Sequence, residues 1–263
     1  MKKTMLKSFG DKLMKVENHC EMQMKKVLFG KEYKRNRELY EKLNTREEFN
    51  YNKEYARPCY SDRYKQAGSL GAYFWQDLWA ARHIYEDAPK KHIDIGSRID
   101  GFIGHISCFV EDVQLIDVRP LDKNIPNVTY WCMDATKLEN IESESISSIS
   151  SLCALEHFGL GRYGDDINPE GCFEAIDSIQ RVIKKGGKAY IAVPIGKEHL
   201  EFDAHRIFQA STIVECFSQM ELVEFAAVHD VEDYIEYNID IHKYDDEWNN
   251  GLRFGLFMFV KNR

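Results

Sequence analysis

From His92 to the C-terminus the sequence alternates short apolar stretches with stretches of helical spacing. Seven stretches are predicted as strands: 92–96, 113–119, 128–134, 145–154, 188–194, 222–229 and 253–261. Several of them are apolar without alternation, which is typical of parallel strands covered on both faces. Helices are expected over 101–110, 169–184 and 211–219. Strands and helices that alternate at this spacing predict a doubly wound α/β sheet.

The two ends of the chain depart from this pattern. The acidic stretch between the last two predicted strands contains no apolar helix, so the last strand is expected to run antiparallel. Residues 1–50 have helical spacing, and an irregular aromatic stretch follows them up to Ser69. We therefore expect a helical N-terminal extension at 1–67 and an α/β domain at 68–263.

Charge is distributed unevenly along the chain. Residues 1–70 contain 17 Lys and Arg against 10 Asp and Glu, a balance of +7, so the net charge of −8 leaves the remainder at −15. An acidic main body argues against nucleic acid as the principal partner, because binding phosphates needs a high density of basic groups. The basic arm is expected to be a solvated helix on the acidic body, with binding of a phosphate-bearing partner as the less favoured alternative. Such an arm would suit a homodimer.

The sequence also indicates a compartment. No apolar run approaches the roughly 20 residues of a membrane span, and the lysine-containing N-terminus lacks the continuous apolar stretch of a secretory signal. The seven cysteines form no CxxC pair, which argues against a zinc site or a disulfide framework. We therefore expect a cytoplasmic protein with no membrane span and no metal site.

The first predicted strand contains an acid, Asp94, and runs into the turn Gly96-Ser97-Arg98-Ile99-Asp100-Gly101. In a dinucleotide site the third position of this turn is usually glycine, so that the chain can approach a pyrophosphate. Here Arg98 occupies that position, which disfavours a dinucleotide. S-adenosylmethionine has no phosphate and carries a cationic amino group and a sulfonium. Asp94 suits that positive end by organising the turn around the amino group.

Two further acids follow at the ends of the next two predicted strands. Asp117 is placed to accept hydrogen bonds from both ribose hydroxyls, and Asp134 is placed to accept one from the adenine amino group. Each acid alone is equally well explained as a turn or helix-cap residue. Ligands of such sheets bind beyond the carboxyl ends of the strands. Three acids at three successive strand ends therefore indicate a site for a cationic nucleoside.

These features resemble the class I S-adenosylmethionine-dependent methyltransferases. Asp94-Ile95-Gly96, Asp117, Asp134 and the stretches LEH (155–157) and IKKGG (183–187) match the motifs of that superfamily. The stretches DIGSRIDGF, LIDVRPL, EHFGLGRYGDDINPEG and AHRIF are similar to a methyltransferase-like group catalogued as a domain of unknown function. The resemblance covers residues 68–208 and implies a Rossmann-like, seven-stranded, mostly parallel sheet.

The resemblance also implies which residues contact the cofactor. The implied S-adenosylmethionine contacts are Gln76, Asp94, Gly96, Ser97, Arg98, Asp117, Val118, Asp134, Ala135 and Cys153. The sequence departs from the superfamily at Arg98, where a second glycine is expected. Arg98 would either pair with the carboxylate of the cofactor or fold back onto Asp100.

Methyl transfer to a hydroxyl needs a base that takes the proton, and histidine is the usual choice. His157 follows the fourth predicted strand and His205 follows the fifth. Both are candidate catalytic residues, with a structural histidine in a loop as the alternative for each.

The loop GLGRYGDDINPEG (159–171) contains candidate acceptor-binding residues. Arg162 can bind a phosphate or carboxylate with its planar guanidinium, and Tyr163 can stack on a ring. Arg206 is a second candidate for binding an anion. Asp165 and Asp166 are expected to cap the next helix, with metal binding as the less favoured alternative.

The sequence thus favours an enzyme that O-methylates a small polar, anionic or nucleotide-linked acceptor, for example a sugar precursor of surface-polysaccharide biosynthesis. Two alternatives stay open. The sheet could serve as a non-catalytic scaffold, which Arg98 in the turn favours. A nicotinamide-dependent oxidoreductase is disfavoured by the missing glycine and by Asp94, whose charge would repel a pyrophosphate.

Overall fold

The structure is a computed structural model that describes residues 2–60, 63–64, 67–68, 70–229, 234–248 and 253–262, with side chains described from residue 23 onward. The chain divides into two compact units, residues 1–69 and residues 70–263. Among the described residues, none of the helices has both the length and the apolar character needed to cross a membrane.

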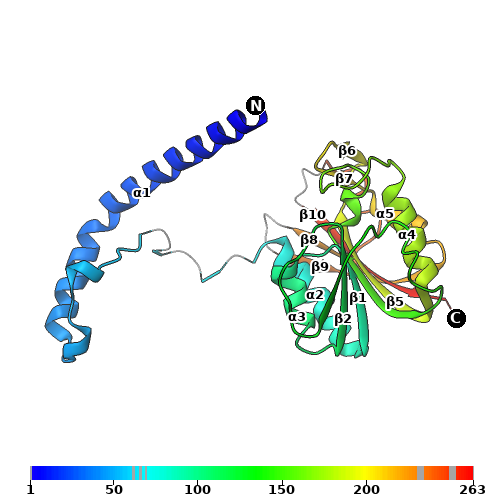
Figure 1. Cartoon of the computed structure of the whole chain (residues 1–263), viewed down its shortest axis with the longest axis horizontal. Coiled ribbons are helices and arrows are strands. Elements are labelled where there is room, and N and C mark those ends of the chain that lie inside the picture. The colour runs from blue at the N-terminus through cyan, green and yellow to red at the C-terminus, as the bar shows by residue number, and fades with distance from the viewer. Residues whose placement is uncertain are drawn as a thin grey trace. The chain divides into compact units, whose positions relative to one another are not determined.

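Unit 1 (residues 1–69) contains a long helix and a segment that folds back along it (Figure 1). Helix α1 spans Lys2–Leu43, and two short 3-10 helices follow at Glu47–Phe49 and Lys53–Tyr55. Asn44 stabilises the turn after α1, because its side-chain nitrogen donates to the Arg46 carbonyl at 2.8 Å and its side-chain oxygen accepts from the Arg46 N–H at 3.2 Å.

In unit 2 (residues 70–263), the described residues form one eight-stranded sheet in the order β3-β2-β1-β4-β5-β10-β8-β9. The strands are β1 (Lys91–Ile95), β2 (Asp112–Asp117), β3 (Val128–Cys132), β4 (Ile146–Leu152), β5 (Ile183–Pro194), β8 (Met220–His229), β9 (Tyr234–Tyr237) and β10 (Arg253–Lys261). Neighbours among β1 to β5 pair in parallel, whereas β10 runs antiparallel to β5 and β8. The predicted α/β class and the antiparallel last strand are therefore confirmed.

Helices cover both faces of this sheet (Figure 1). Helices α2 (Ala72–Asp87) and α3 (Gly104–Ile106) share one apolar core with the sheet, and α4 (Gly171–Val182) and α5 (Ala210–Cys216) share the other. Successive strand residues enter opposite cores: Leu115 packs with α2 and Ile116 packs with α4. Because both faces of the sheet are buried, the strand positions that face either core are apolar, and the sequence therefore lacks an alternation of apolar and polar residues.

Some elements differ from the sequence prediction. β9 lies in the acidic stretch that is expected to be a loop, and it adds an eighth strand antiparallel to β8. β6 (His199–Glu201) and β7 (His205–Ile207) form a separate hairpin after β5. The helix expected over 101–110 is a π-helical turn, Ile99–Ile103, followed by α3. These elements are short or lie at an edge, so they bury few side chains and have no long apolar pattern.

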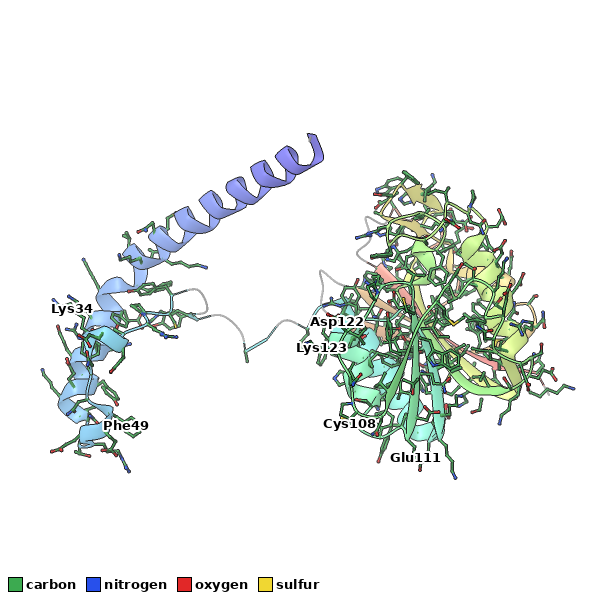
Figure 2. The ribbon with its side chains drawn as sticks, in the orientation of Figure 1. Lys34, Phe49, Cys108, Glu111, Asp122 and Lys123 are labelled. Carbon is green, nitrogen blue, oxygen red and sulfur yellow. The ribbon has the colours of Figure 1, made fainter. Side chains whose placement is uncertain are left out.

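The connectivity determines where a ligand can bind. The chain passes from β1 outward to β2 and β3 and then returns to β4 on the other side of β1. Open α/β sheets bind ligands at such a reversal, beyond the carboxyl ends of the strands. Cys108 and Glu111, which precede β2, mark the opposite end of the sheet (Figure 2).

Candidate active site

A cavity of about 400 Å³ lies beyond the carboxyl ends of β1 to β4. Many of the residues predicted from the sequence line it: Gly96, Arg98, Asp117, Val118, Asp134, Ala135, Cys153, His157 and Tyr163. Others lie outside its lining: Gln76, Asp94, Ser97, Arg162, His205 and Arg206. The structure therefore brings the acids of β2 and β3 together with one of the two candidate histidines.

Asp94 is fully buried within β1 and organises the turn that follows. Its carboxylate accepts hydrogen bonds from the Ser97 N–H at 3.0 Å, the Ser97 hydroxyl at 2.6 Å and the Ser150 hydroxyl of β4 at 2.5 Å. The Ser97 hydroxyl in turn accepts from the Leu152 N–H at 3.0 Å. Burial raises the pKa of Asp94 to about 7. Asp94 and Ser97 thus join β1, the turn and β4 from behind the cavity wall.

His92 extends this network along β1, and sequence reasoning did not single it out. Its Nε2 lies 2.8 Å from the Ser150 hydroxyl, and its Nδ1 lies 2.7 Å from the Ser148 hydroxyl. Burial lowers the pKa of His92 to about 3, so the ring is neutral at physiological pH. The two serines lie two positions apart in β4, so their side chains point to the same face of the sheet and form a polar row there.

The turn after β1 is shaped by Gly96 and Arg98. Gly96 has a φ of +71°, and a Cβ on it would lie 2.8 Å from the Cβ of Ala154, so only glycine fits. Arg98 folds back onto Asp100, to which its Nε and Nη2 donate at 3.0 Å and 2.7 Å. Its guanidinium also lies over the ring of Tyr73, 4.8 Å from the centroid. Of the two alternatives for Arg98, the structure shows the pairing with Asp100.

Asp117 ends β2 at the cavity, where it pairs with Arg119. Both carboxylate oxygens accept from Arg119: Nε donates at 2.9 Å and 3.1 Å, and Nη2 donates to the second oxygen. The guanidinium lies 4.8 Å from the ring centroid of Tyr163. Sequence reasoning missed Arg119, although an arginine two residues after a strand-end acid is well placed for this local contact. A ligand hydroxyl that binds Asp117 must share the carboxylate with Arg119 or displace it.

Asp134 and Ala135 follow β3 and line the cavity. One oxygen of the exposed Asp134 carboxylate accepts from the Thr136 N–H at 2.8 Å, which is the turn role considered as an alternative for each acid. The other oxygen has no hydrogen bond among the described residues, so the turn and a ligand can use the same carboxylate.

Gln76 lies in α2 and is buried, outside the cavity lining. It reaches the wall through Cys153, whose thiol donates to the Gln76 side-chain oxygen at 2.9 Å. Burial raises the pKa of the Cys153 thiol well above its usual value, so the thiol stays protonated. Gln76 thus supports Cys153 from outside the cavity lining.

His157 lies in the short helix Leu155–His157 and faces the cavity. Its Nδ1 lies 2.7 Å from the Ala204 carbonyl, which can only accept, so we assign the ring hydrogen to Nδ1 and the lone pair to Nε2. Burial lowers the pKa of His157 to about 4. His205 lies outside the cavity lining in β7, with its Nε2 3.1 Å from a Glu201 oxygen.

Glu156 is a residue whose role the sequence did not reveal. Its carboxylate is 2% exposed, and one oxygen lies 3.6 Å from Nε2 of His157. The other oxygen, Oε2, is buried and has no hydrogen-bond partner among the described residues. Burial raises the pKa of Glu156 to about 8. An unpaired buried carboxyl beside a cavity histidine is characteristic of a functional site.

The loop after His157 is held by hydrogen bonds between side chains and backbone groups. Asp165 accepts from the N–H groups of Gly159 and Gly161 at 2.8 Å and 3.2 Å, so it stabilises the loop and does not cap α4 as expected. Arg162 donates to the Ala204 carbonyl at 2.9 Å.

Arg206 does not have the predicted geometry for anion binding. Its guanidinium donates to the carbonyls of Phe158 at 2.7 Å, Pro169 at 3.1 Å and Glu156 at 3.4 Å. It therefore fastens β7 to the loop that carries His157, which is a structural role. The sequence cannot show this because the hairpin that carries Arg206 is itself not predicted.

Comparisons with known proteins agree with this geometry. Residues 130–250 match a family described as Caenorhabditis protein of unknown function, DUF268. No curated protein matches the sequence. A solved 1,6-didemethyltoxoflavin-N1-methyltransferase of Burkholderia thailandensis, with bound S-adenosylhomocysteine, is similar at 12% identity and a TM-score of 0.54 over 73% of this chain and 79% of that one. The N-methyltransferase NodS of Bradyrhizobium japonicum is similar at 13% identity and a TM-score of 0.50 over 77% and 93%.

These structural similarities identify the fold of unit 2. The reaction has to be inferred from the residues of the site. The [4+2]-cyclase SpnF is also similar, at 15% identity and a TM-score of 0.52 over 73% of this chain and 82% of that one. One fold thus supports more than one kind of chemistry. The predicted resemblance to class I methyltransferases and to a domain of unknown function is confirmed. Unit 2 has the class I methyltransferase fold.

Proposed function

We propose that unit 2 is an S-adenosylmethionine-dependent methyltransferase that O-methylates a small polar acceptor. The observation that carries the proposal is the single cavity lined by Gly96, Asp117, Asp134 and His157 at the carboxyl ends of four successive strands. When bound, S-adenosylmethionine supplies an electrophilic methyl group on a sulfonium. A neutral or cationic nucleoside fits a wall that contains carboxylates and has no glycine-rich phosphate turn.

The chain's own residues suit the parts of this cofactor. Asp117 would accept hydrogen bonds from the two ribose hydroxyls, and Asp134 would accept one from the adenine amino group with its free oxygen. Gly96 allows close backbone approach, because no side chain projects from the turn at that point. Val118, Ala135 and Cys153 also line the cavity. Asp94, Ser97 and Gln76 would act indirectly, by fixing the turn and Cys153.

We propose His157 as the base. With its hydrogen on Nδ1 bound to the Ala204 carbonyl, Nε2 is free to take the proton of an acceptor hydroxyl. The lowered pKa of His157 keeps the ring neutral, and thus able to accept a proton, at physiological pH. The neighbouring Glu156 carboxyl lies 3.6 Å from Nε2, and its raised pKa keeps it mainly protonated at physiological pH, so it would stabilise the imidazolium that forms only after losing its own proton. His205 is the less suited candidate, because it lies outside the cavity lining.

The acceptor that we propose is a hydroxyl of a small anionic or nucleotide-linked sugar, such as a surface-polysaccharide precursor. Tyr163 lines the cavity, and the guanidinium groups of Arg119 and Arg162 lie 4.8 Å and 5.2 Å from its ring centroid. A sugar ring can pack on an aromatic ring, and a guanidinium beside it can bind a phosphate or carboxylate. Lys137 adds a further cation to the lining.

Ligand binding measured by calorimetry tests the cofactor half of this proposal. We expect the full chain to bind S-adenosylhomocysteine at one site and to bind neither NAD nor NADP. Binding of a nicotinamide dinucleotide in place of S-adenosylhomocysteine would contradict the proposal and support an oxidoreductase.

A screen of hydroxylated sugars and sugar nucleotides tests the catalytic half, with formation of S-adenosylhomocysteine as the readout. We expect turnover by the wild type, and we expect His157→Ala to keep cofactor binding but to lose turnover about 100-fold or more. His205→Ala is the matched control and should retain activity. Cofactor binding without product from any acceptor would support the non-catalytic alternative.

A further inference from the structure

Helix α1 is unusually long, and only a short segment of the chain packs against it. Its 42 residues extend about 63 Å at 1.5 Å per residue, whereas helices of globular proteins average about 11–12 residues. Most helices in proteins are stabilised by packing an apolar face against other elements. The question is therefore which faces of α1 are covered within unit 1.

One face of the C-terminal half of α1 is covered by the segment that folds back. The ring of Phe29 lies 6.0 Å from that of Tyr64, and the ring of Tyr33 lies 6.1 Å from that of Tyr60. Further along the same face, Arg37 lies over the Tyr51 ring at 5.1 Å, and the Tyr40 hydroxyl donates to the Phe49 carbonyl at 3.1 Å. The steps from 29 to 33, 37 and 40 are those of a single helix face.

A second row of apolar residues follows a different period along the helix. Its members alternate spacings of three and four: Leu6, Phe9, Leu13, Val16, Cys20, Gln23 and Val27. This is the heptad pattern of a coiled coil, with positions a at 6, 13, 20 and 27 and positions d at 9, 16 and 23. The row extends over three heptads, and Gln23 is its only polar member.

Val27, at the end of the row whose side chains the structure describes, is exposed to solvent. Val27 is 79% exposed, and the neighbouring Met24 and Leu28 are 61% and 70% exposed. Val27 lies about 160° around the helix from Phe29 at about 100° per residue, so the folded-back segment and the heptad row occupy different faces. The described end of the row, at Val27, is therefore available to a partner that presents a matching row.

We propose that the partner is α1 of a second copy of the chain, in a parallel, in-register coiled coil. A heptad row is self-complementary under a two-fold axis, which is the commonest symmetry of homo-oligomers. In a parallel pair Lys12, at position g, lies beside Glu17 of the other copy, at position e, and the two charges attract.

Measurement of molar mass by light scattering tests this pairing on the full chain. We expect twice the 30.8 kDa of one chain for the wild type and the mass of one chain for Leu13→Lys, which places a charge at position a. Met14→Lys, one residue further and at the outward position b, is the matched control and should remain a dimer. A monomeric wild type, or a Leu13→Lys variant that still dimerises, would overturn the proposal.

Cys20, at position a, allows the parallel orientation of the two helices to be tested by disulfide cross-linking without introducing a cysteine. Mild oxidation should link Cys20 to Cys20 and give a dimer on non-reducing gels, and Cys20→Ser should abolish this band. Cys59→Ser, which removes an exposed cysteine of the same unit, should leave the band unchanged. A dimer whose cross-link does not depend on Cys20 would overturn the in-register parallel pairing. Sedimentation of a monomeric wild type with phosphatidylserine vesicles would instead assign the row to a lipid surface.

Discussion

Strands β1 and β2 each contain an aspartate at the carboxyl end, and the two carboxylates have opposite surroundings. Asp94 is 0% exposed and accepts from two serine hydroxyls and a backbone N–H. The Asp117 side chain is 10% exposed, lines the cavity and pairs with the charged Arg119. The strands that carry them are neighbours in the sheet, with Asp94 opposite Leu115.

This difference shows that the position of an aspartate at a strand end does not by itself determine its role. Asp94 precedes the last residue of β1 and is enclosed by β4, so its hydrogen bonds build the turn. Asp117 is the last residue of β2, and β3 on its other side leaves it open to the cavity. We therefore propose a role in stability for the inner carboxylate, Asp94, and a role in ligand binding for the outer one, Asp117, which yields separable predictions.

The largest effect is expected for Asp94→Ala. The substitution leaves the Ser97 N–H and the Ser150 hydroxyl without their buried acceptor, and each unsatisfied group costs about 1–3 kcal/mol. We expect the free energy of unfolding in urea to fall by about 3 kcal/mol. Asp134→Ala is the control, because the exposed Asp134 loses only its bond to Thr136. An unchanged urea midpoint for Asp94→Ala would show that the network is not structural.

Asp117→Ala should separate binding from folding. Its stability should stay within about 1 kcal/mol of the wild type, because the lost pair with Arg119 is partly exposed. We expect S-adenosylhomocysteine to bind about 30-fold more weakly, since hydrogen bonds to a charged group contribute about 1.5–3 kcal/mol. Calorimetry measures this change, and Asp112→Ala at the other end of β2 should bind normally. Equal affinity of both variants would remove Asp117 from the cofactor site.

The sequence predicted the fold well where side chains enter a core. All seven predicted strands are present, because each is an apolar run bounded by polar or glycine-containing turns. β9 was missed because Glu236 and the acidic residues around it are tolerated on an edge strand. The hairpin β6–β7 was missed because its strands contain only three residues each.

The site was predicted less completely, because its geometry depends on contacts between distant segments. Asp117, Asp134 and His157 are strand-exit residues, and topology alone brings them to one edge of the sheet. In contrast, Arg206 reaches the carbonyls of a loop 37 to 50 positions earlier in the chain. Glu156 is buried by packing that no local pattern records. Sequence spacing therefore predicts the residues that line the cavity, but not the residues that hold them in place through contacts between distant segments.

The pH dependence of stability should distinguish the inner carboxylate from other acids. Its folded pKa of about 7 lies above the ordinary value of 3.8, so the folded state binds this proton more tightly than the unfolded chain. The contribution of Asp94 to stability is therefore full below about pH 4 and is lost as the pH rises towards 7. The neutral Asn of Asp94→Asn removes this dependence.

Urea unfolding of both proteins between pH 4 and pH 7 measures this effect. We expect the stability of the wild type relative to Asp94→Asn to fall by about 1 kcal/mol or more over that range. His92 titrates in both proteins, so its opposite trend cancels in the difference. A difference that stays constant with pH would mean that Asp94 is ionised in the folded state at pH 4.

The smallest effect is expected for Arg119→Ala, which tests whether the outer carboxylate is shared. Arg119 occupies both oxygens of Asp117 side-on, and these are the positions that a pair of ribose hydroxyls would use. A partly exposed ion pair contributes at most about 1 kcal/mol, so its removal should tighten S-adenosylhomocysteine binding about 3-fold. Arg119→Lys keeps the charge without the planar fork and should give an intermediate affinity. Weaker binding by Arg119→Ala would instead indicate that the Arg119 guanidinium itself contacts the cofactor.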